Sequence, residues 1–563
     1  MTTSTADPMT TPAVASPGGL THRQILTILV GLLMGMFLAA LDQTIVATSI
    51  RTIADRLGGL DHQAWATTAY LITSTIVTPL YGKLGDIYGR KRLFLFAISI
   101  FIVGSAASSF AGSMMQLAVF RAVQGIGAGG LFALALAIIG DIVPPRERAK
   151  YQGYFLAVWG TSSVLGPVIG GFLAGQSSLL GITGWRWVFL VNVPIGIAAF
   201  AVVAKTLHLH HHRLDHRIDW LGAGLLAVSL VPLLLVAESG RDWGWGSATA
   251  LACYATGVVF AILFLYQEWR MQEEAIFPLR MFRNKTVGVA SVASVVIGVA
   301  MFGGLTSLPL YLQIVKGASP TKAGLLLLPL TLGIMAGSIV SGQVISRTGR
   351  YRAFPITGTF LLLAGLFAFH YVHYDTPLWQ TMVVCVFFGV GLGFNFQPLT
   401  LAVQNAVPPQ QIGVATSAAT FTRQMGGTMG TAVFLSILFS TVTGRITSAL
   451  AKIAPTADFQ AALRDPANSK TVAMLKAFQS GGSSGGGSFL KDSSILNTMD
   501  PRLAKPFLVG FADSMDLVFL CGAAIMVIGC IVMLALPNNE LRSQSAYAAR
   551  GTEADAAAGA PAV

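Results

Sequence analysis

Residues Gly82–Arg92 read GKLGDIYGRKR and connect two apolar stretches, residues 65–81 and 93–112, each long enough to cross a bilayer. Because the connection is so short, the two stretches should form an antiparallel helical hairpin. The turn contains one carboxylate and four cations, Asp86, Lys83, Arg90, Lys91 and Arg92. Basic loops remain on the cytoplasmic side of a membrane, so the turn is predicted to face the cytoplasm.

The composition of the whole chain indicates an integral membrane protein. Of its 563 residues, 54% are hydrophobic and 11% charged, whereas soluble proteins carry about 25% charged residues. The net charge of +12 arises from Lys and Arg concentrated in alternate loops, which sets membrane orientation and does not indicate nucleic-acid binding. Fourteen apolar segments predict an all-α protein with both termini in the cytoplasm.

The apolar segments divide the chain into two halves. We expect a disordered cytoplasmic N-terminus (1–24), a six-helix bundle (25–206), a linker with two extra helices (207–275), a second six-helix bundle (276–540) and a disordered cytoplasmic tail (541–563). The four cysteines lie in apolar segments without metal-ligand spacing. No cofactor or metal is therefore expected.

The charged turn resembles the loop between helices 2 and 3 of the major facilitator superfamily. The resemblance implies a cytoplasmic latch between the two halves, formed by Gly82, Asp86, Gly89, Arg90 and Lys91. Asp86 should then meet the N-terminus of a second-half helix, where the helix dipole favours negative charge. A weaker copy, GQVISRTGRYR at Gly342–Arg352, has Ser346 in place of the carboxylate. The repeat indicates that the halves share a fold but should not lock identically.

Two ionisable residues lie deep in apolar segments. Asp42 follows Leu41 in LDQTIV, and Arg121 lies in RAVQGIGA. Charges at such depth are expensive and are usually functional. Both segments resemble motifs of the superfamily's drug/proton antiporters, which implies that Asp42 and Arg121 couple transport to protons. The alternatives are that Asp42 caps a helix near the outer surface and that Arg121 extends to an interface.

Further motifs point to the same subfamily. Gly166, Pro167, Gly170 and Gly171 resemble the helix-5 motif of exporters, although a generic packing seam also has this composition. A central pair of extra helices is typical of fourteen-helix drug/proton antiporters. In the thirteenth segment, RQMGG contains Arg423 and Gln424, which are predicted to form a gate of the second half. The alternative is that Arg423 is a structural ion-pair partner. Residues expected to line a substrate cavity, or else to pack between helices, are Gln124, Phe394, Asn395, Phe396 and Gln397.

Two hydrophilic stretches interrupt this pattern. Five histidines fall within residues 208–216, where a solvated basic linker is the simpler interpretation than a metal site. Residues 441–506 form a long external loop with a Gly/Ser-rich centre, a possible docking point for a periplasmic partner.

We therefore expect a monomeric, proton-driven antiporter of a bacterial inner membrane. It should export diverse lipophilic or cationic drugs by alternating access and so confer antibiotic resistance. Export of an endogenous lipid or a self-made metabolite is the alternative. A membrane enzyme or receptor is disfavoured, because the chain lacks paired catalytic carboxylates, a nucleotide-binding loop and a soluble signalling domain.

Overall fold

The computed structural model describes residues 22–57, 63–207, 218–469, 471–473, 475, 496 and 499–542. The histidine-rich stretch and the Gly/Ser-rich centre of the long loop lie outside these residues, as do almost all of the predicted N-terminal and C-terminal tails. The helices that run through the bundle are, in chain order, α1 (His22–Leu57), α2 (Gln63–Tyr88), α3 (Arg90–Ser109), α4 (Met114–Ile142), α5 (Pro145–Gly175), α6 with α7 (Trp187–Leu190, Asn192–Thr206), α8 (Trp220–Trp243), α9 (Ala248–Met271), α10 (Lys285–Leu310), α11 with α12 (Pro320–Leu326, Leu328–Thr348), α13 (Ala353–His370), α14 (Leu378–Ala406), α15 (Ile412–Ile453) and α19 (Pro501–Leu534).

Thirteen spans in the described part are long and apolar enough to cross a membrane. Helix α2 is not among them because it is rich in Thr, Ser and Tyr. Several of these hydroxyls bond within the helix: Thr73 donates to the Ala69 carbonyl and Thr78 to the Ser74 carbonyl. Helix α2 nevertheless packs closely along α4. With α2, the described helices agree with the fourteen spans predicted.

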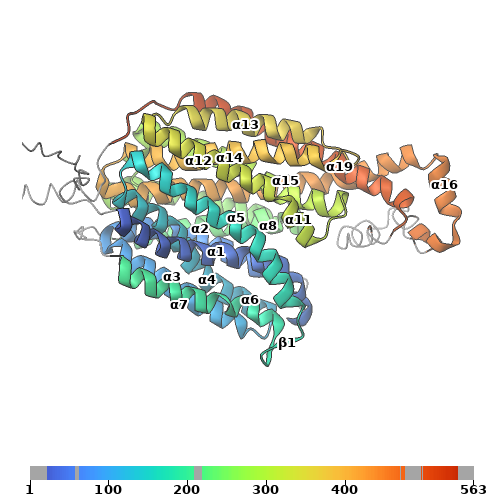
Figure 1. The fold of residues 1–563 in the computed structure, drawn as a ribbon, viewed down its shortest axis with the longest axis horizontal. Coiled ribbons are helices and arrows are strands. Elements are labelled where there is room, and N and C mark those ends of the chain that lie inside the picture. Colours follow the sequence, from blue (N-terminus) through green and yellow to red (C-terminus); the bar gives the residue numbers. More distant parts are fainter. Residues whose placement is uncertain are drawn as a thin grey trace, which may run out of the picture.

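The helices form two bundles (Figure 1). In the first, α2 and α3 pack on α4, and α1 packs on α5; in the second, α12 and α13 pack on α14, and α10 and α19 on α15. The bundles meet where α5 packs on α12 and where α15 packs on α2 and α4. Helices α8 and α9 pack on each other, and α8 also touches α2 and α15. The extra pair therefore lies beside one of the two seams between the bundles.

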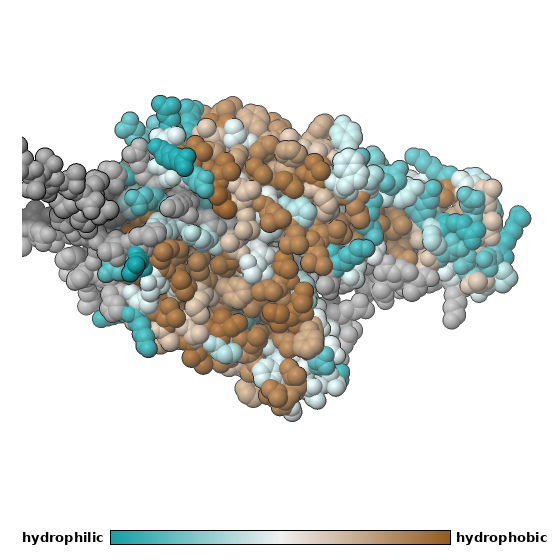
Figure 2. All heavy atoms as spheres, in the orientation of Figure 1, coloured by the Kyte–Doolittle hydropathy of each residue, from teal (hydrophilic) through white to brown (hydrophobic). Residues whose placement is uncertain are grey.

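A broad band of hydrophobic side chains covers the face of the bundles drawn in Figure 2, with hydrophilic residues at both ends. We call the end with the turn 82–92 the latch end. The opposite end carries a short hairpin of β1 (Ser178–Leu179) and β2 (Ile182–Thr183) and the helix α16 (Ala457–Arg464), and we call it the loop end. Helix α1 begins and α19 ends at the latch end (Figure 1).

Two predicted boundaries are wrong. Helix α1 already begins at His22, so residues 22–24 are not part of a disordered tail. The long loop is also shorter than 441–506, because α15 continues to Ile453 and α19 starts at Pro501. The reason is amphipathic packing: Val442 and Ile446 are buried, and Ile446 lies where a Cβ on Gly510 would clash. As a result Asp513 and Asp516 lie well inside α19, not at its start.

Candidate functional site

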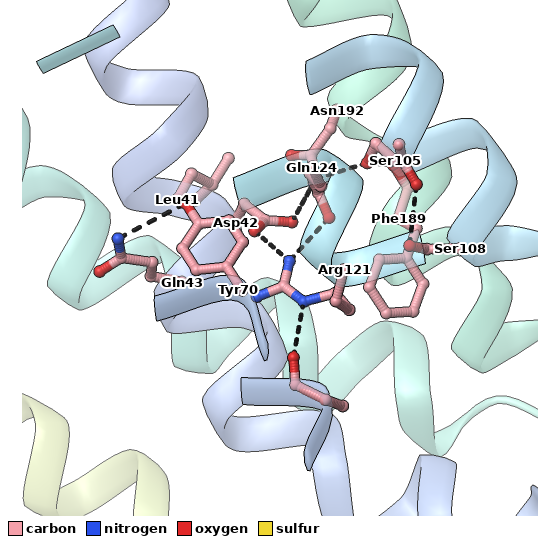
Figure 3. Close-up of polar contacts among 12 residues, drawn as sticks. Leu41, Asp42, Gln43, Tyr70, Ser105, Ser108, Arg121, Gln124, Phe189 and Asn192 are labelled. Atoms are coloured by element: carbon pink, nitrogen blue, oxygen red, sulfur yellow. Dashed lines mark hydrogen bonds and ion pairs between the residues drawn. The ribbon is translucent and has the colours of Figure 1, made fainter. Parts of the chain in front are cut away.

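Asp42 on α1 and Arg121 on α4 form a buried ion pair inside the first bundle (Figure 3). Arg121 Nη1 lies 2.5 Å from Asp42 Oδ2, and the two side chains are 1% and 0% exposed. Helix α1 continues for four turns beyond Asp42, so Asp42 is not a cap. Arg121 points into the bundle and does not extend to an interface.

Two amides complete the surroundings of the carboxylate. Gln124 Nε2 donates to Asp42 Oδ1 at 2.9 Å, and Asn192 Nδ2 donates to the same oxygen at 2.8 Å. Asn192 starts α7 and also donates to Ser105 Oγ on α3. Gln124, expected in a substrate cavity, is thus part of the buried network. Asn192 was missed, although it is an isolated amide in the apolar run VFLVNVPIG.

Arg121 has contacts besides the carboxylate. Its Nη1 donates to Gln124 Oε1 at 2.7 Å, and its Nε donates to the Ala66 carbonyl at 3.2 Å. Its guanidinium carbon lies 4.2 Å from the centre of the Tyr70 ring, which is a cation–π distance. The arginine therefore keeps partners even when the charge on Asp42 is neutralised.

The second charged group lies at the latch end. Arg90 donates to Asp86 Oδ1 at 2.9 Å and contacts Asp141 Oδ2 at 2.9 Å, and it also bonds the Ala137 carbonyl. Asp86 Oδ2 accepts the backbone N–H of Val414 at 3.0 Å. Since Val414 lies in the first turn of α15, the carboxylate meets the N-terminus of a second-half helix. Asp141 was not anticipated, although it lies in the last turn of α4 and begins the charged stretch DIVPPRERAK.

The glycines and the lysine of this turn fix its shape. Gly89 has φ of 92° and precedes α3, a backbone angle that favours glycine. A Cβ on Gly82 would lie 2.1 Å from Ser417 Oγ, so only glycine allows α2 to approach α15 this closely. Lys91 donates to the Ala204 carbonyl at 2.8 Å and thereby joins the turn to the end of α7.

A second polar connection between the halves was also missed. Arg148, at the start of α5, donates to Gln404 Oε1 on α14 at 2.6 Å. Its other donors reach the carbonyls of Gly140 and Val143. Gln404 Nε2 in turn donates to the Leu136 carbonyl on α4. This connection also lies at the latch end, and it gives no sequence signal because a glutamine is its second-half partner.

The glycines of the helix-5 motif face α1. A Cβ on Gly166 would lie 2.0 Å from Thr44 Oγ1, and one on Gly170 would lie 2.6 Å from Thr48 Oγ1. Gly171 has nothing within 4 Å of its added Cβ. Pro167 lies within α5, and its ring is 3.7 Å from a Cβ built on Gly324 of the second bundle. Gly166 and Gly170 thus pack α5 on the helix that carries Asp42.

The second-half candidates divide into residues that pack helices together and Arg423, a cation that has no ion-pair partner among the described residues. Asn395 is fully buried and bonds Thr359 Oγ1 and the Gly391 carbonyl, so it packs helices together. Gln424 Oε1 lies 3.5 Å from Thr78 Oγ1 across the two halves. Arg423 lies with its guanidinium carbon 4.5 Å from the centre of the Phe396 ring. Phe394 contacts Phe354 edge-on, and Gln397 is buried.

Comparison with known proteins decides the family. Residues 32–431 match the sequence profile of the Major Facilitator Superfamily. The chain belongs to this superfamily. It is 36% identical to Multidrug resistance protein 3 of Bacillus subtilis over 75% of this chain and 81% of that protein. It is also 30% identical to Multidrug transporter protein MdtP of the same organism, over 92% and 94% of the two chains.

Two further likenesses bear on function and fold. A tetracycline resistance determinant of Streptomyces rimosus is 38% identical over 58% of this chain and 93% of that protein. Among solved structures, the proton:xylose symporter XylE bound to 6-bromo-6-deoxy-D-glucose has a TM-score of 0.57 at 13% identity, covering 94% and 100% of the chains. The superfamily member is therefore a multi-pass membrane transporter.

Proposed function

We propose that this superfamily member is a proton-driven antiporter that exports lipophilic small molecules from the cytoplasm by alternating access. The observation that carries the proposal is the buried Asp42–Arg121 pair. A carboxylate so enclosed costs several kcal/mol unless it is paired. Arg121 keeps its other contacts when Asp42 is protonated, so the pair is suited to exchanging a proton.

Protonation of Asp42 changes the first bundle in a defined way. The charge attraction to Arg121, which is strong in a medium of low dielectric constant, is lost. Arg121 then retains Gln124 Oε1, the Ala66 carbonyl and the Tyr70 ring. Because Asp42 binds Arg121 on α4, Gln124 on α4 and Asn192 on α7, the proton alters how α1 sits against both helices. Gly166 and Gly170 transmit that movement to α5.

Alternating access requires that one end close while the other opens. In the described chain, the hydrogen bonds of Asp86 with Val414 and of Arg148 with Gln404 close the latch end. We assign the latch end to the cytoplasm of a bacterial inner membrane, in keeping with its basic turns. Asp42 is nearer the loop end of α1, so a proton from the external side has the shorter path to it, while its carboxylate is enclosed in this state. Each charge entering contributes about 2.3 kcal/mol per 100 mV.

The test uses inside-out membrane vesicles that hold a pH gradient. Lipophilic compounds of either charge, ethidium among them, are added while the internal pH is followed. The wild type should dissipate the gradient when a substrate is added, and Asp42→Asn should not. Asp375→Asn is the matched control, because Asp375 is an exposed carboxylate in the turn before α14.

Two outcomes would count against the proposal. If Asp42→Asn still moves protons with substrate, Asp42 is not the carrier. If no compound moves protons in the wild type, drug/proton antiport is wrong, and endogenous lipids and metabolites become the substrates to screen.

A further inference from the structure

Arg423 is a cation at the middle of the membrane. It lies 11 residues after Ile412, where α15 begins at the latch end, which corresponds to a depth of about 16 Å along the helix. The hydrocarbon core is about 30 Å thick. An arginine at that depth costs several kcal/mol unless it pairs with a charged or polar group, and such a residue is normally functional.

The other deep or buried arginines of the described bundles show what a partnered guanidinium looks like. Arg90 contacts two carboxylates, Arg121 contacts one, and Arg148 contacts three oxygens. Within the described residues, Arg423 has no hydrogen-bond acceptor or ion-pair partner. Its contact is the face of Phe396. The five guanidinium N–H groups of Arg423 are therefore available to a ligand.

Arg423 lies on α15, the second-half helix that packs on α2 and α4 of the first half. Helix α15 packs along α10 and touches α14 only sparsely, and the Arg423 side chain reaches across to Phe396 on α14. The next residue, Gln424, meets Thr78 on α2 of the first bundle. Arg423 is partly exposed, so a small molecule between the halves can reach it.

The charges nearby favour an anion over a cation. A lipophilic cation is best stabilised by a free carboxylate, but Asp42 accepts from three donors, and Asp86 accepts from Arg90 and from the N-terminus of α15. Asp516 contacts His373 near the loop end. A planar guanidinium instead matches a carboxylate or sulfonate and binds it through two parallel hydrogen bonds. The Phe396 ring offers an apolar surface for the rest of the molecule.

We propose that Arg423 binds the acidic group of the substrate, so that this transporter prefers amphipathic organic acids to lipophilic cations of the same shape. The proposal rests on the proposed export function, whose substrate charge it specifies. It changes the expected charge of the substrate, because the sequence predicted lipophilic or cationic drugs. Arg423 acts here as a specificity-determining residue that touches the substrate, while Asp42 and Arg121 handle the proton.

The test is a binding measurement with two probes that differ only in charge. Purified protein in lipid nanodiscs is dialysed against 1-pyrenebutyrate or (1-pyrenebutyl)trimethylammonium, with empty nanodiscs as the correction for partitioning. The wild type should bind the carboxylate about tenfold or more tightly than the ammonium, as expected for a charge-assisted hydrogen bond. Stronger binding of the ammonium by the wild type would overturn the proposal without any variant.

Variants then identify the residue responsible. Arg423→Gln should lower affinity for the carboxylate about tenfold or more and leave affinity for the ammonium unchanged or improved. Arg423→Lys, which keeps the charge but not the planar fork, should retain part of the preference. Arg347→Gln is the matched control, because it removes one exposed cation from the end of α12. Equal weakening of both probes in Arg423→Gln would mean that Arg423 is structural, and the proposal would fail.

This measurement does not depend on proton coupling. Asp42→Asn should keep the charge preference in binding while losing substrate-driven proton movement in vesicles. If the preference is present but protons do not move in the wild type, the antiport proposal fails and the Arg423 proposal stands. If protons move with cations alone, the reverse holds.

Discussion

The turns 82–92 and 342–352 are copies of one sequence, 260 residues apart, yet they do different things. In the first, Asp86 and Arg90 are buried and bridge to α15 of the other half. In the second, Arg350 is exposed and Ser346 bonds the Gln343 carbonyl of its own helix. The described contacts of the second turn, from Tyr351 and Arg352, go to Pro537 and Leu534 at the end of α19, in the same half.

The carboxylate distinguishes the two turns. Both turns keep a glycine with positive φ, 92° at Gly89 and 70° at Gly349, although ψ is 134° at the first and 1° at the second. Replacing the carboxylate by Ser346 removes the group that attracts both an arginine and a helix N-terminus. Arg148 and Gln404 add a second connection between the halves beside the first, because Gln404 also bonds Leu136 on α4 and Thr416 on α15. The latch end is therefore closed by a carboxylate at a helix N-terminus and by an amide that accepts from an arginine.

Removing the carboxylate of the first turn should have the largest effect. Asp86→Ala leaves the Val414 N–H unpaired and Arg90 short of one partner, and breaking a buried ion pair costs about 3 kcal/mol. The closed latch end should lose about a hundredfold in population, and efflux should fall with it. Spin labels at the exposed positions 92 and 347, in a background without native cysteines, measure the opening as a longer distance.

The equivalent position in the second turn provides the control. Ser346→Ala should leave both the label distance and efflux unchanged, because its hydroxyl contacts the carbonyl of its own helix. An Asp86→Ala protein with the wild-type distance distribution would show that the first turn is no latch.

Adding a methyl group at Gly82, where α2 approaches α15, should have the next largest effect. A Cβ on Gly82 would lie 2.1 Å from Ser417 Oγ and 2.8 Å from the Gly413 carbonyl oxygen. Gly82→Ala should therefore weaken closure by about 1–3 kcal/mol, seen as faster labelling of a cysteine at the latch end. Adding Ser417→Gly should restore part of it. Gly171→Ala is the control, since its new methyl group meets nothing within 4 Å; equal effects of the two would refute the packing argument.

The connection through Gln404 should prove weaker than the one through Asp86. Gln404→Ala removes the hydrogen bonds of Gln404 with Arg148, the Leu136 carbonyl and Thr416, but Arg148 keeps the Gly140 and Val143 carbonyls. The loss should be about 1–2 kcal/mol, smaller than that of Asp86→Ala in the same spin-label measurement. An opening as large as that of Asp86→Ala would mean that the two connections contribute equally and that the carboxylate has no special role.

The sequence was sufficient for the helices and for the charged residues deep within them, although Asp141, the second carboxylate at Arg90, was missed. Alternating apolar stretches predicted the spans, and the depth of Asp42 and Arg121 in two of them singled out both residues. Asp86 was expected at a second-half helix N-terminus, where Val414 is found. In each case a charge in an unusual place marked the residue.

Neutral partners and packing could not be predicted in this way. Asn192 is 150 residues from Asp42, and Gln404 is 256 residues from Arg148, so their roles depend on how the helices assemble. Asn395 is a polar residue of the kind that lines a substrate cavity, but its amide bonds Thr359. The extension of α15 to Ile453 depends on Gly510 allowing Ile446 to approach α19, which no local pattern reveals.

Introducing a carboxylate into the second turn should have the smallest effect, and it tests most directly what the carboxylate contributes. Ser346→Asp recreates the spacing of Asp86 and Arg90 with Arg350 four residues on, but Arg350 is exposed. Because exposed ion pairs contribute about 0–1 kcal/mol, the label distance at the latch end should change little, and the thermal midpoint should move by only a few degrees. A strong shift toward closure would instead show that a carboxylate alone creates a latch, and that burial by the opposite half follows from the charge.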